Sequence, residues 1–242
     1  MLAEKVLTTI DVAGTSHQGH ARRRNEDSFL IAPAKGLALV ADGVGGQGDG
    51  AWASHRALEL FIHRMESVGP AKRAETAVLN ILQFVHDKMY AEARAREGRP
   101  SGTTIAGLWA PQGSTGPVTI FNIGDSPVFH FSRGKLGKVS KDHSLHQLWV
   151  DGGCTGPEPS KRSIVQALGI SDQIAPHVAT FRVLAGDAVL ICTDGLSGAI
   201  GTERMSALLV HAIGSQAACN ALLNDALAGP AKDNVTVSVC RF

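Results

Sequence analysis

Aspartates at the ends of apolar segments are the residues of this sequence best suited to chemistry. Asp42 and Asp194 each follow a short apolar run and precede a glycine. Asp125 closes another apolar segment, and Asp233 opens the last one. Four aspartates at strand ends could converge at one edge of a sheet. Two further Asp-Gly pairs are predicted to be ordinary turns: Asp49-Gly50 and Asp151-Gly152.

A cluster of this kind needs cations, because neighbouring carboxylates repel one another and raise one another's pKa. Oxygen ligands without nearby histidine or cysteine favour hard ions, Mg²⁺ or Mn²⁺, over zinc or copper. Two such ions about 4 Å apart can share a bridging hydroxide and clamp substrate oxygens during in-line displacement at phosphorus. The expected chemistry is therefore metal-assisted hydrolysis.

A basic segment could hold the phosphate of such a substrate. Arg22, Arg23 and Arg24 precede two more carboxylates, Glu26 and Asp27. Arginine suits this role, because its planar guanidinium makes paired hydrogen bonds to phosphate oxygens. Three arginines alone would more often be a solvated basic turn. The acidic residues that follow favour the phosphate clamp.

The elements that position these residues alternate between strands and helix pairs. Alternating or continuous apolar runs predict strands at 37–41, 118–123, 128–131, 188–193 and 235–239. Helical spacing of apolar residues predicts helices at 57–65, 77–89, 203–213 and 216–227, with a break at Gly69-Pro70. This order predicts an α+β fold in which helices cover antiparallel sheets. The Gly- and Pro-rich segment 149–162 is predicted to be a mobile loop.

Composition limits the other possibilities. The 242 residues carry 23 Lys+Arg and 22 Asp+Glu, a net charge of +1, and 44% are hydrophobic. We expect one domain over residues 1–242 and no nucleic-acid partner, which would usually require a basic excess. The four cysteines show no metal-binding spacing, and no leader or membrane-spanning run is evident. We therefore expect a cytoplasmic monomer with reduced thiols.

Taken together and in order, the motifs resemble those of the PPM family, the metal-dependent protein serine/threonine phosphatases. The matching segments are 22–27, Asp42-Gly43-Val44-Gly45-Gly46, Ser101-Gly102-Thr103-Thr104, Gly124-Asp125-Ser126, Asp142-His143-Ser144, Ala167-Leu168-Gly169, Cys192-Thr193-Asp194-Gly195 and Asp233-Asn234-Val235-Thr236. The resemblance spans residues 19–236 and implies a central sandwich of two antiparallel β-sheets flanked by pairs of α-helices.

The resemblance also implies how two ions would be bound. Asp42 would bridge both metals and orient the hydroxide between them. Asp194 and Asp233 would complete the first metal's ligands. Gly43 would contribute its backbone carbonyl, and Glu26 would bind the second metal directly or through water.

Three further roles follow from the resemblance. Asp27 would lie behind the ligands and orient metal-bound water. Asp125, with or without Asp194, would bind a third metal, as in bacterial members of the family. Arg22 would hold the substrate phosphate. The implied cofactors are thus two to three Mn²⁺ or Mg²⁺ ions.

The sequence departs from common family patterns at positions that are not ligands. Val44 stands where some members have a histidine proposed as general acid, so metal-bound water becomes the default proton donor. Ser101, Pro127 and His130 replace residues that are frequent in relatives. The segment between Ser144 and Ala167 is short, which predicts a reduced flap beside the site.

The predicted function is hydrolysis of phosphoserine and phosphothreonine on proteins by a bridging metal-bound hydroxide, opposing a Ser/Thr protein kinase. Its partners would be phosphoprotein substrates and a cognate kinase, with secretion-system signalling as one pathway hypothesis. Two alternatives remain. Gly43-x-Gly45-x-x-Gly48 fits a dinucleotide-binding fingerprint, which would indicate an oxidoreductase. A non-catalytic phosphoprotein-binding pseudophosphatase is the other.

Overall fold

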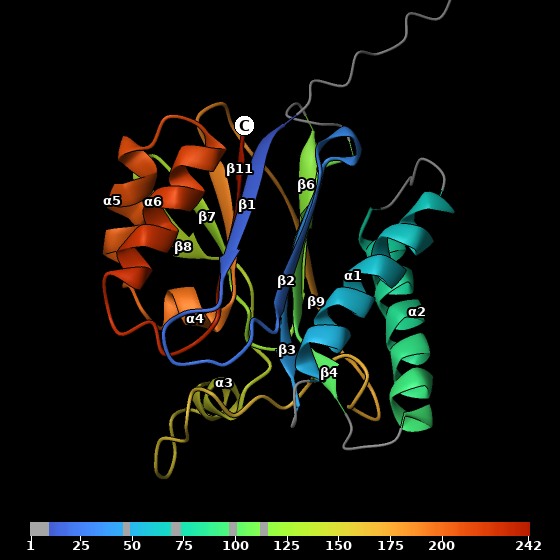
Figure 1. The fold of residues 1–242 in the computed structure, drawn as a ribbon. Coiled ribbons are helices and arrows are strands. Elements are labelled where there is room, and N and C mark those ends of the chain that lie inside the picture. The colour runs from blue at the N-terminus through green and yellow to red at the C-terminus, as the bar shows by residue number, and fades with distance from the viewer. Residues whose placement is uncertain (1–9, 46–48, 69–73, 97–100, 112–115) are drawn as a thin grey trace, which may run out of the picture.

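Two antiparallel β-sheets pack face to face in the computed structural model, and helices cover the outer face of each (Figure 1). The structure describes residues 10–45, 49–68, 74–96, 101–111 and 116–242. The four layers are thus helices, sheet, sheet and helices. This arrangement confirms the predicted α+β sandwich. No helix in the described ranges has the length and apolarity needed to span a membrane.

The first sheet has the strand order β1-β11-β10-β7-β8. Its strands are β1 (Asp11–His17), β7 (Val128–Ser132), β8 (Lys135–Lys138), β10 (Ala188–Cys192) and β11 (Val235–Arg241). The second sheet has the order β2-β3-β5-β6-β9, and β4 pairs with β3. Its strands are β2 (Asp27–Ala32), β3 (Leu37–Val44), β4 (Gly102–Thr103), β5 (Ile105–Trp109), β6 (Pro117–Ile123) and β9 (His177–Arg182).

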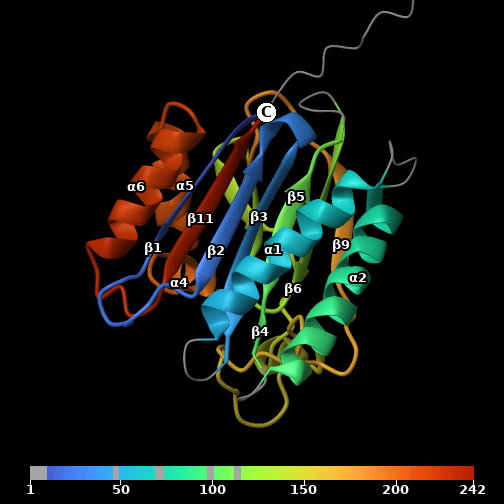
Figure 2. The same ribbon diagram turned by 45° about the vertical axis from the view of Figure 1, so that its right-hand side comes forward.

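Helices α1 and α2 cover the second sheet, and α5 and α6 cover the first (Figure 2). The helices are α1 (Gly50–Glu66), α2 (Ala74–Ala95), α3 (Leu145–Asp151), α4 (Asp194–Ser197), α5 (Thr202–His211) and α6 (Ser215–Leu227), with a 3₁₀ turn at Pro33–Lys35. Each covering helix has an apolar stripe, as predicted. The predicted break at Gly69-Pro70 lies outside the described residues.

Alternation along β3 explains where its last side chains point. Leu37 and Leu39 pack in the core beneath α1 and α2, whereas Ala38 and Val40 belong to the core between the sheets. Successive side chains of a strand point to opposite faces. Asp42 continues the series of Ala38 and Val40, so its carboxylate emerges between the sheets, at the end of the sandwich.

Two segments differ from their sequence-based predictions. β3 continues to Val44, because β4 pairs with Gly43 and Val44. The predicted loop at 149–162 begins inside α3 and then folds back on that helix. Trp149 Nε1 donates to the carbonyl of Gly156 (3.2 Å), and His146 Nε2 lies 3.0 Å from Glu158 Oε1. Two side-chain contacts therefore link the segment after α3 to that helix.

The strand ends that carry the aspartates approach so closely that glycine is required. A Cβ atom built on Gly195 would lie 1.8 Å from the carbonyl oxygen of Asn234. Thr193 N also donates to Thr236 O at 3.0 Å, which holds the start of α4 against β11. Gly195 is thus the residue that lets Asp194 and Asp233 lie side by side.

Replacing Gly195 by alanine should lower the free energy of unfolding by about 1–3 kcal/mol, because the added methyl group overpacks a backbone contact. Gly137→Ala is the matched control. A Cβ on Gly137 meets nothing within 4 Å, so its effect should stay within about 0.5 kcal/mol. Urea unfolding in EDTA measures both variants without a contribution from metal binding. Equal stability of the two variants would contradict this account of Gly195.

Candidate functional site

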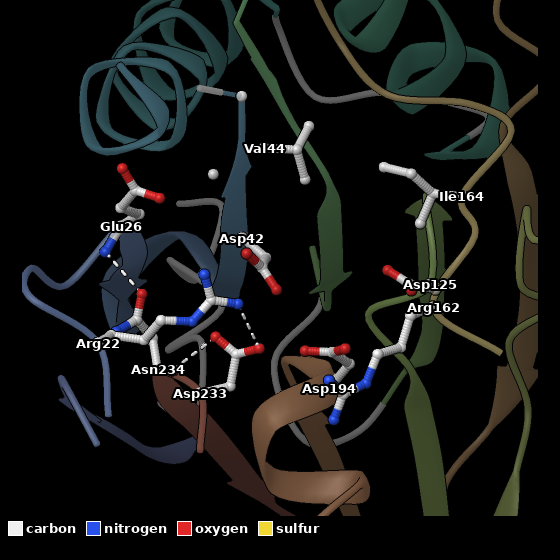
Figure 3. Close-up of a pocket in the computed structure, with 12 residues that line it drawn as sticks. Arg22, Glu26, Asp42, Val44, Asp125, Arg162, Ile164, Asp194, Asp233 and Asn234 are labelled. Carbon is white, nitrogen blue, oxygen red and sulfur yellow. Dashed lines mark hydrogen bonds and ion pairs between the residues drawn. The ribbon is translucent and has the colours of Figure 1, made fainter. Parts of the chain in front are cut away.

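A pocket of about 350 Å³ opens at the end of the sandwich where the predicted residues meet (Figure 3). Its acidic residues come from five separate segments of the chain. The lining residues are Arg22, Glu26, Asp42, Gly43, Val44, Gly45, Asp125, Arg162, Ile164, Asp194, Asp233 and Asn234. The structure therefore brings all the predicted site residues to this pocket except Asp27, which lies behind it.

Asp42 is held rigidly at the centre. Its backbone N–H donates to Thr104 Oγ1 (3.0 Å), and its carbonyl accepts from Thr103 Oγ1 (2.8 Å) and Thr104 N (2.9 Å). Burial raises the pKa of Asp42 well above its usual range, and the charges of Asp27 and Asp194 add to the effect. This carboxylate therefore gains strongly from a bound cation.

Gly43 allows three segments to meet beside Asp42. Its N–H donates to the carbonyl of Glu26 at 3.1 Å. A Cβ atom on Gly43 would lie 2.1 Å from the carbonyl oxygen of Gly50 and 2.7 Å from that of Glu26. The absence of a side chain thus brings β3, the start of α1 and the segment before β2 into contact, and Glu26 reaches the pocket.

Arg22 and Asp233 form an ion pair at the mouth of the pocket. Arg22 Nη2 lies 2.8 Å from Asp233 Oδ2, and the arginine side chain is 51% exposed. The other oxygen of Asp233 accepts from Asn234 N at 2.9 Å. The guanidinium is therefore close to the carboxylates and still accessible to a ligand from solvent.

Arg162 contributes a second cation that sequence reasoning did not identify. It lies near Asp194 on the wall of the pocket formed by Arg162 and Ile164 (Figure 3). Burial raises the pKa of Asp194, Asp233 adds to this effect, and the charges of Arg162 and Arg22 oppose it. Arg162 had no motif of its own, because it ends the irregular segment 149–162.

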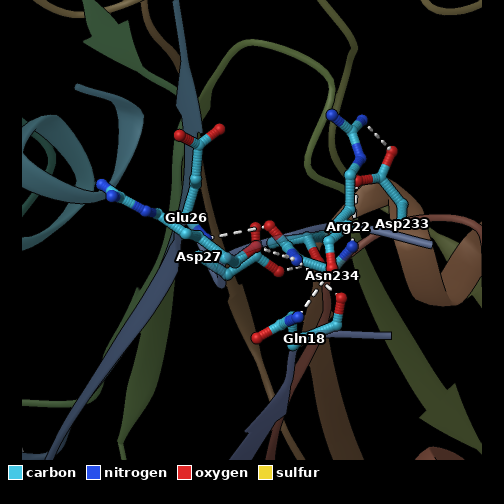
Figure 4. A network of polar contacts seen from close by, with 8 residues as sticks. Gln18, Arg22, Glu26, Asp27, Asp233 and Asn234 are labelled. Atoms are coloured by element: carbon cyan, nitrogen blue, oxygen red, sulfur yellow. Dashed lines mark hydrogen bonds and ion pairs between the residues drawn. The ribbon is translucent and has the colours of Figure 1, made fainter. Parts of the chain in front are cut away.

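Asn234 holds the segment that carries Arg22, Arg23 and Arg24 in place, a role that the sequence motifs did not indicate. Its Nδ2 donates to the carbonyls of Gln18 (2.8 Å) and Arg24 (2.9 Å), and its Oδ1 accepts from Glu26 N (2.9 Å) (Figure 4). One side chain thus satisfies three backbone groups on both sides of the arginines. Its place beside Asp233, at the start of an apolar strand, was the available signal.

Asp27 lies beneath the pocket and joins the two sheets. It pairs with Asp42 in the β2–β3 register. Its Oδ2 accepts from Thr236 Oγ1 (2.7 Å) and Thr193 Oγ1 (2.9 Å). Burial raises the pKa of Asp27 to about 6, although these two hydrogen bonds lower it. Its Oδ1 is buried and has no hydrogen-bond partner within the described part of the chain.

Asp125 stands on the opposite side from Glu26. Burial raises its pKa to about 7, and the negative charges of Asp194 and Asp142 add to the effect. His143 steadies the turn before it, since His143 Nδ1 accepts from Gly124 N (3.1 Å) and His143 N donates to Gly124 O (2.8 Å). This histidine therefore supports the backbone at Asp125.

The donor set fits hard divalent ions. Five carboxylates and the Gly43 carbonyl offer only oxygen, and two arginines do not balance five negative charges. In the ranges described, no three His, Cys, Asp or Glu side chains surround one point as they stand. Asp233 Oδ2 is occupied by Arg22, so a metal ion at this carboxylate would compete with that ion pair.

Comparisons with known proteins agree with the motifs. A family model described as protein phosphatase 2C matches residues 13–229. The serine/threonine protein phosphatase PstP of Mycobacterium tuberculosis is 30% identical over 97% of this chain and 45% of its own length. The chain thus spans about half the length of that relative.

Solved structures show the same architecture. PppA, a key regulatory component of T6SS in Pseudomonas aeruginosa, superposes with a TM-score of 0.81 at 29% identity, covering 97% of this chain and 98% of PppA. The catalytic domain of PstP in complex with two manganese ions gives 0.83 at 25% identity, covering 96% and 98%. With the family model matching most of its length, the chain belongs to the protein phosphatase 2C family of metal-dependent (PPM) serine/threonine phosphatases.

Proposed function

We propose that this chain is one catalytic domain that hydrolyses phosphoserine and phosphothreonine on proteins and so opposes a Ser/Thr protein kinase. The observation that carries the proposal is the convergence of five carboxylates and an accessible arginine on one pocket. Hydrolysis of a phosphate monoester needs both features. Cations held by the carboxylates and the positive charge of the arginine together stabilise the negative charge of the phosphate and of the leaving group.

Two ions would be held by Asp42, Asp194, Asp233, Glu26 and the backbone carbonyl of Gly43. When bound, these ions would supply an acidified water as nucleophile and would neutralise charge on the phosphate. Asp42, fixed by Thr103 and Thr104, would orient that water. The manganese-bound relative supports a count of two.

A third ion is proposed at Asp125 together with Asp194. Both carboxylates line the same pocket, and the charge of Asp194 helps to raise the pKa of Asp125. Asp27, which lies beneath the pocket, would orient water bound to the metal ions. Its hydrogen bonds to Thr193 and Thr236 fix one oxygen, and the other faces no described partner.

Arg22 would bind the substrate phosphate by exchanging Asp233 for phosphate oxygens. Arg162, near Asp194, would add a second positive charge to the pocket wall. Val44 stands where some family members have a histidine proposed as general acid, and valine can donate no proton. The proton for the leaving serine or threonine would therefore come from water.

The oxidoreductase alternative disagrees with the topology. A dinucleotide-binding unit needs parallel strands on either side of its crossover helix, but β3 is antiparallel to both β2 and β5. Gly48 of the fingerprint lies outside the described residues. A pseudophosphatase would be expected to lack ligands, whereas every predicted acidic position is present.

We also propose a cytoplasmic monomer whose partners are phosphoproteins and a cognate kinase. PppA is a key regulatory component of T6SS in Pseudomonas aeruginosa, and the likeness of this chain to PppA supports secretion-system signalling as the pathway. A gene neighbourhood that encodes both a Ser/Thr kinase and secretion components is the expected observation. A neighbourhood with neither would count against that pathway.

Hydrolysis of p-nitrophenyl phosphate and of a phosphothreonine peptide should require Mn²⁺ or Mg²⁺ and stop in EDTA. Asp194→Asn should abolish it, because the substitution removes a ligand. Asp151→Asn changes an Asp-Gly pair outside the pocket and should retain activity. Metal-independent turnover, or none with any divalent ion, would reject the proposed function.

Arg22→Ala should raise KM for the phosphopeptide about 10- to 150-fold, as expected for the loss of a charge-assisted contact of about 1.5–3 kcal/mol. Arg22→Lys should recover part of this loss. Steady-state kinetics across a Mn²⁺ titration separates substrate from metal binding, and the apparent Mn²⁺ affinity should not fall, since Asp233 is freed. An unchanged KM would refute the clamp.

Asp42→Asn should stabilise the protein in EDTA at neutral pH while removing its stabilisation by Mn²⁺. The raised pKa of Asp42 means that folding favours the neutral form, so the charged form opposes folding at pH values above its ordinary pKa. The gain should be about 0.5–2 kcal/mol, as for other stabilising substitutions. Thermal unfolding in EDTA tests the predicted gain in stability, and thermal unfolding with Mn²⁺ tests the predicted loss of stabilisation by the metal. A less stable variant in EDTA would contradict the prediction.

A further inference from the structure

Exposed basic residues adjoin the pocket-lining residues in the sequence at two places. Arg23 and Arg24 follow Arg22, Lys232 precedes Asp233, and Lys161 precedes Arg162; all four are exposed. None of the four lines the pocket itself. They are called the basic rim below.

The first side of the rim is assembled from two distant segments. His20 N donates to the carbonyl of Ala231 at 2.8 Å, and Asn234 Nδ2 donates to the carbonyl of Arg24 at 2.9 Å. These bonds hold the segment that carries Arg23 and Arg24 against the turn that carries Lys232. The backbone segments that carry these three basic residues thus meet beside Arg22.

The second side is set by backbone pairing. Leu145 N donates to Ser163 O, and Val165 N donates to His143 O, both at 2.8 Å. Arg162 and Lys161 directly precede this pinned stretch, so the backbone there is fixed at the pocket wall. The nearby Glu158 is engaged by His146 at 3.0 Å.

The rim differs from much of the remaining surface in being unpaired. Several other exposed cations have carboxylate partners, as Arg204 has Asp225 (2.5 Å) and Lys141 has Asp151 (2.7 Å). No rim side chain has an ion-pair partner among the described residues. Charges that stay unpaired around a binding site can attract a ligand of opposite sign and speed its association.

We infer that the basic rim selects phosphopeptides that carry acidic side chains on both sides of the phosphorylated residue. The inference rests on the proposed function, because ions bound in the pocket are needed to offset its own carboxylates. An extended peptide advances about 3.3 Å per residue, so side chains a few positions from a bound phosphoresidue would reach the pocket edges. Acidic ones would meet rim cations there.

The test compares two phosphothreonine peptides, one with glutamates and one with glutamines on both sides of the phosphothreonine. With Mn²⁺ at low salt, kcat/KM should be about tenfold higher for the glutamate peptide, as two or three exposed ion pairs would give. The preference should shrink as salt screens the charges. Non-hydrolysable phosphonate versions, followed by fluorescence anisotropy, should show the same ratio in Kd.

Charge reversal locates the effect. Arg23→Glu with Arg24→Glu, and separately Lys161→Glu with Lys232→Glu, should each lower the ratio. Lys135 pairs with Ser132 and Arg182 pairs with Pro117, at the ends of β7 and β6 that lie away from Asp125. Both cations are exposed, so Lys135→Glu and Arg182→Glu should leave the ratio unchanged. A ratio taken within one variant cancels any loss of folded or metal-loaded enzyme.

The possible failures are distinguishable. A ratio near one in the wild type, or one that all six substitutions change equally, overturns the inference while hydrolysis of both peptides upholds the proposed function. Absence of hydrolysis of both peptides and of p-nitrophenyl phosphate under every divalent ion overturns the proposed function, and the inference fails with it.

Discussion

Repulsion among carboxylates is the constraint on which this structure depends. Asp42, Asp194, Asp233, Asp125 and Glu26 line one pocket, and burial together with neighbouring negative charges raises the pKa of Asp42, Asp125 and Asp194. The fold supplies part of the compensation through Arg22 and Arg162. The rest of the pocket's negative charge is available for divalent ions. Three apolar cores stabilise this otherwise unfavourable arrangement: one beneath α1 and α2, one beneath α5 and α6, and one between the two sheets.

Glycine solves the steric side of the same problem. Gly43 and Gly195 each follow a site aspartate, and each faces a backbone carbonyl at a distance that excludes a side chain. The Asp-Gly pair therefore has two meanings in this chain. At Asp151-Gly152 it closes a short helix, whereas at the two strand ends it lets separate segments touch. Buried strand residues precede each of the two site aspartates, whereas partly exposed residues of helix α3 precede Asp151-Gly152.

Much of the fold and the acidic site could be predicted because strong patterns marked them. A continuous apolar run marked β10, apolar alternation marked β11, helical spacing marked the four covering helices, and the aspartates after apolar runs marked the pocket. The sequence did not predict the edge strands β1 and β9, because many of their residues are half-exposed and apolar and polar residues alternate only weakly along them. Arg162 escaped because its position depends on long-range pairing with the segment around Ser144, which no local pattern encodes.

Asn234 has a consequence for the order in which the molecule is made. Its side chain binds the backbone of residues 18–26, more than 200 positions earlier in the chain, and β11 inserts between β1 and β10. The early segment with Arg22 and Glu26 thus lacks its anchor until the final strand has been synthesised. Contacts this distant in sequence form slowly. A ribosome-bound chain that ends before β11 would therefore have no assembled pocket.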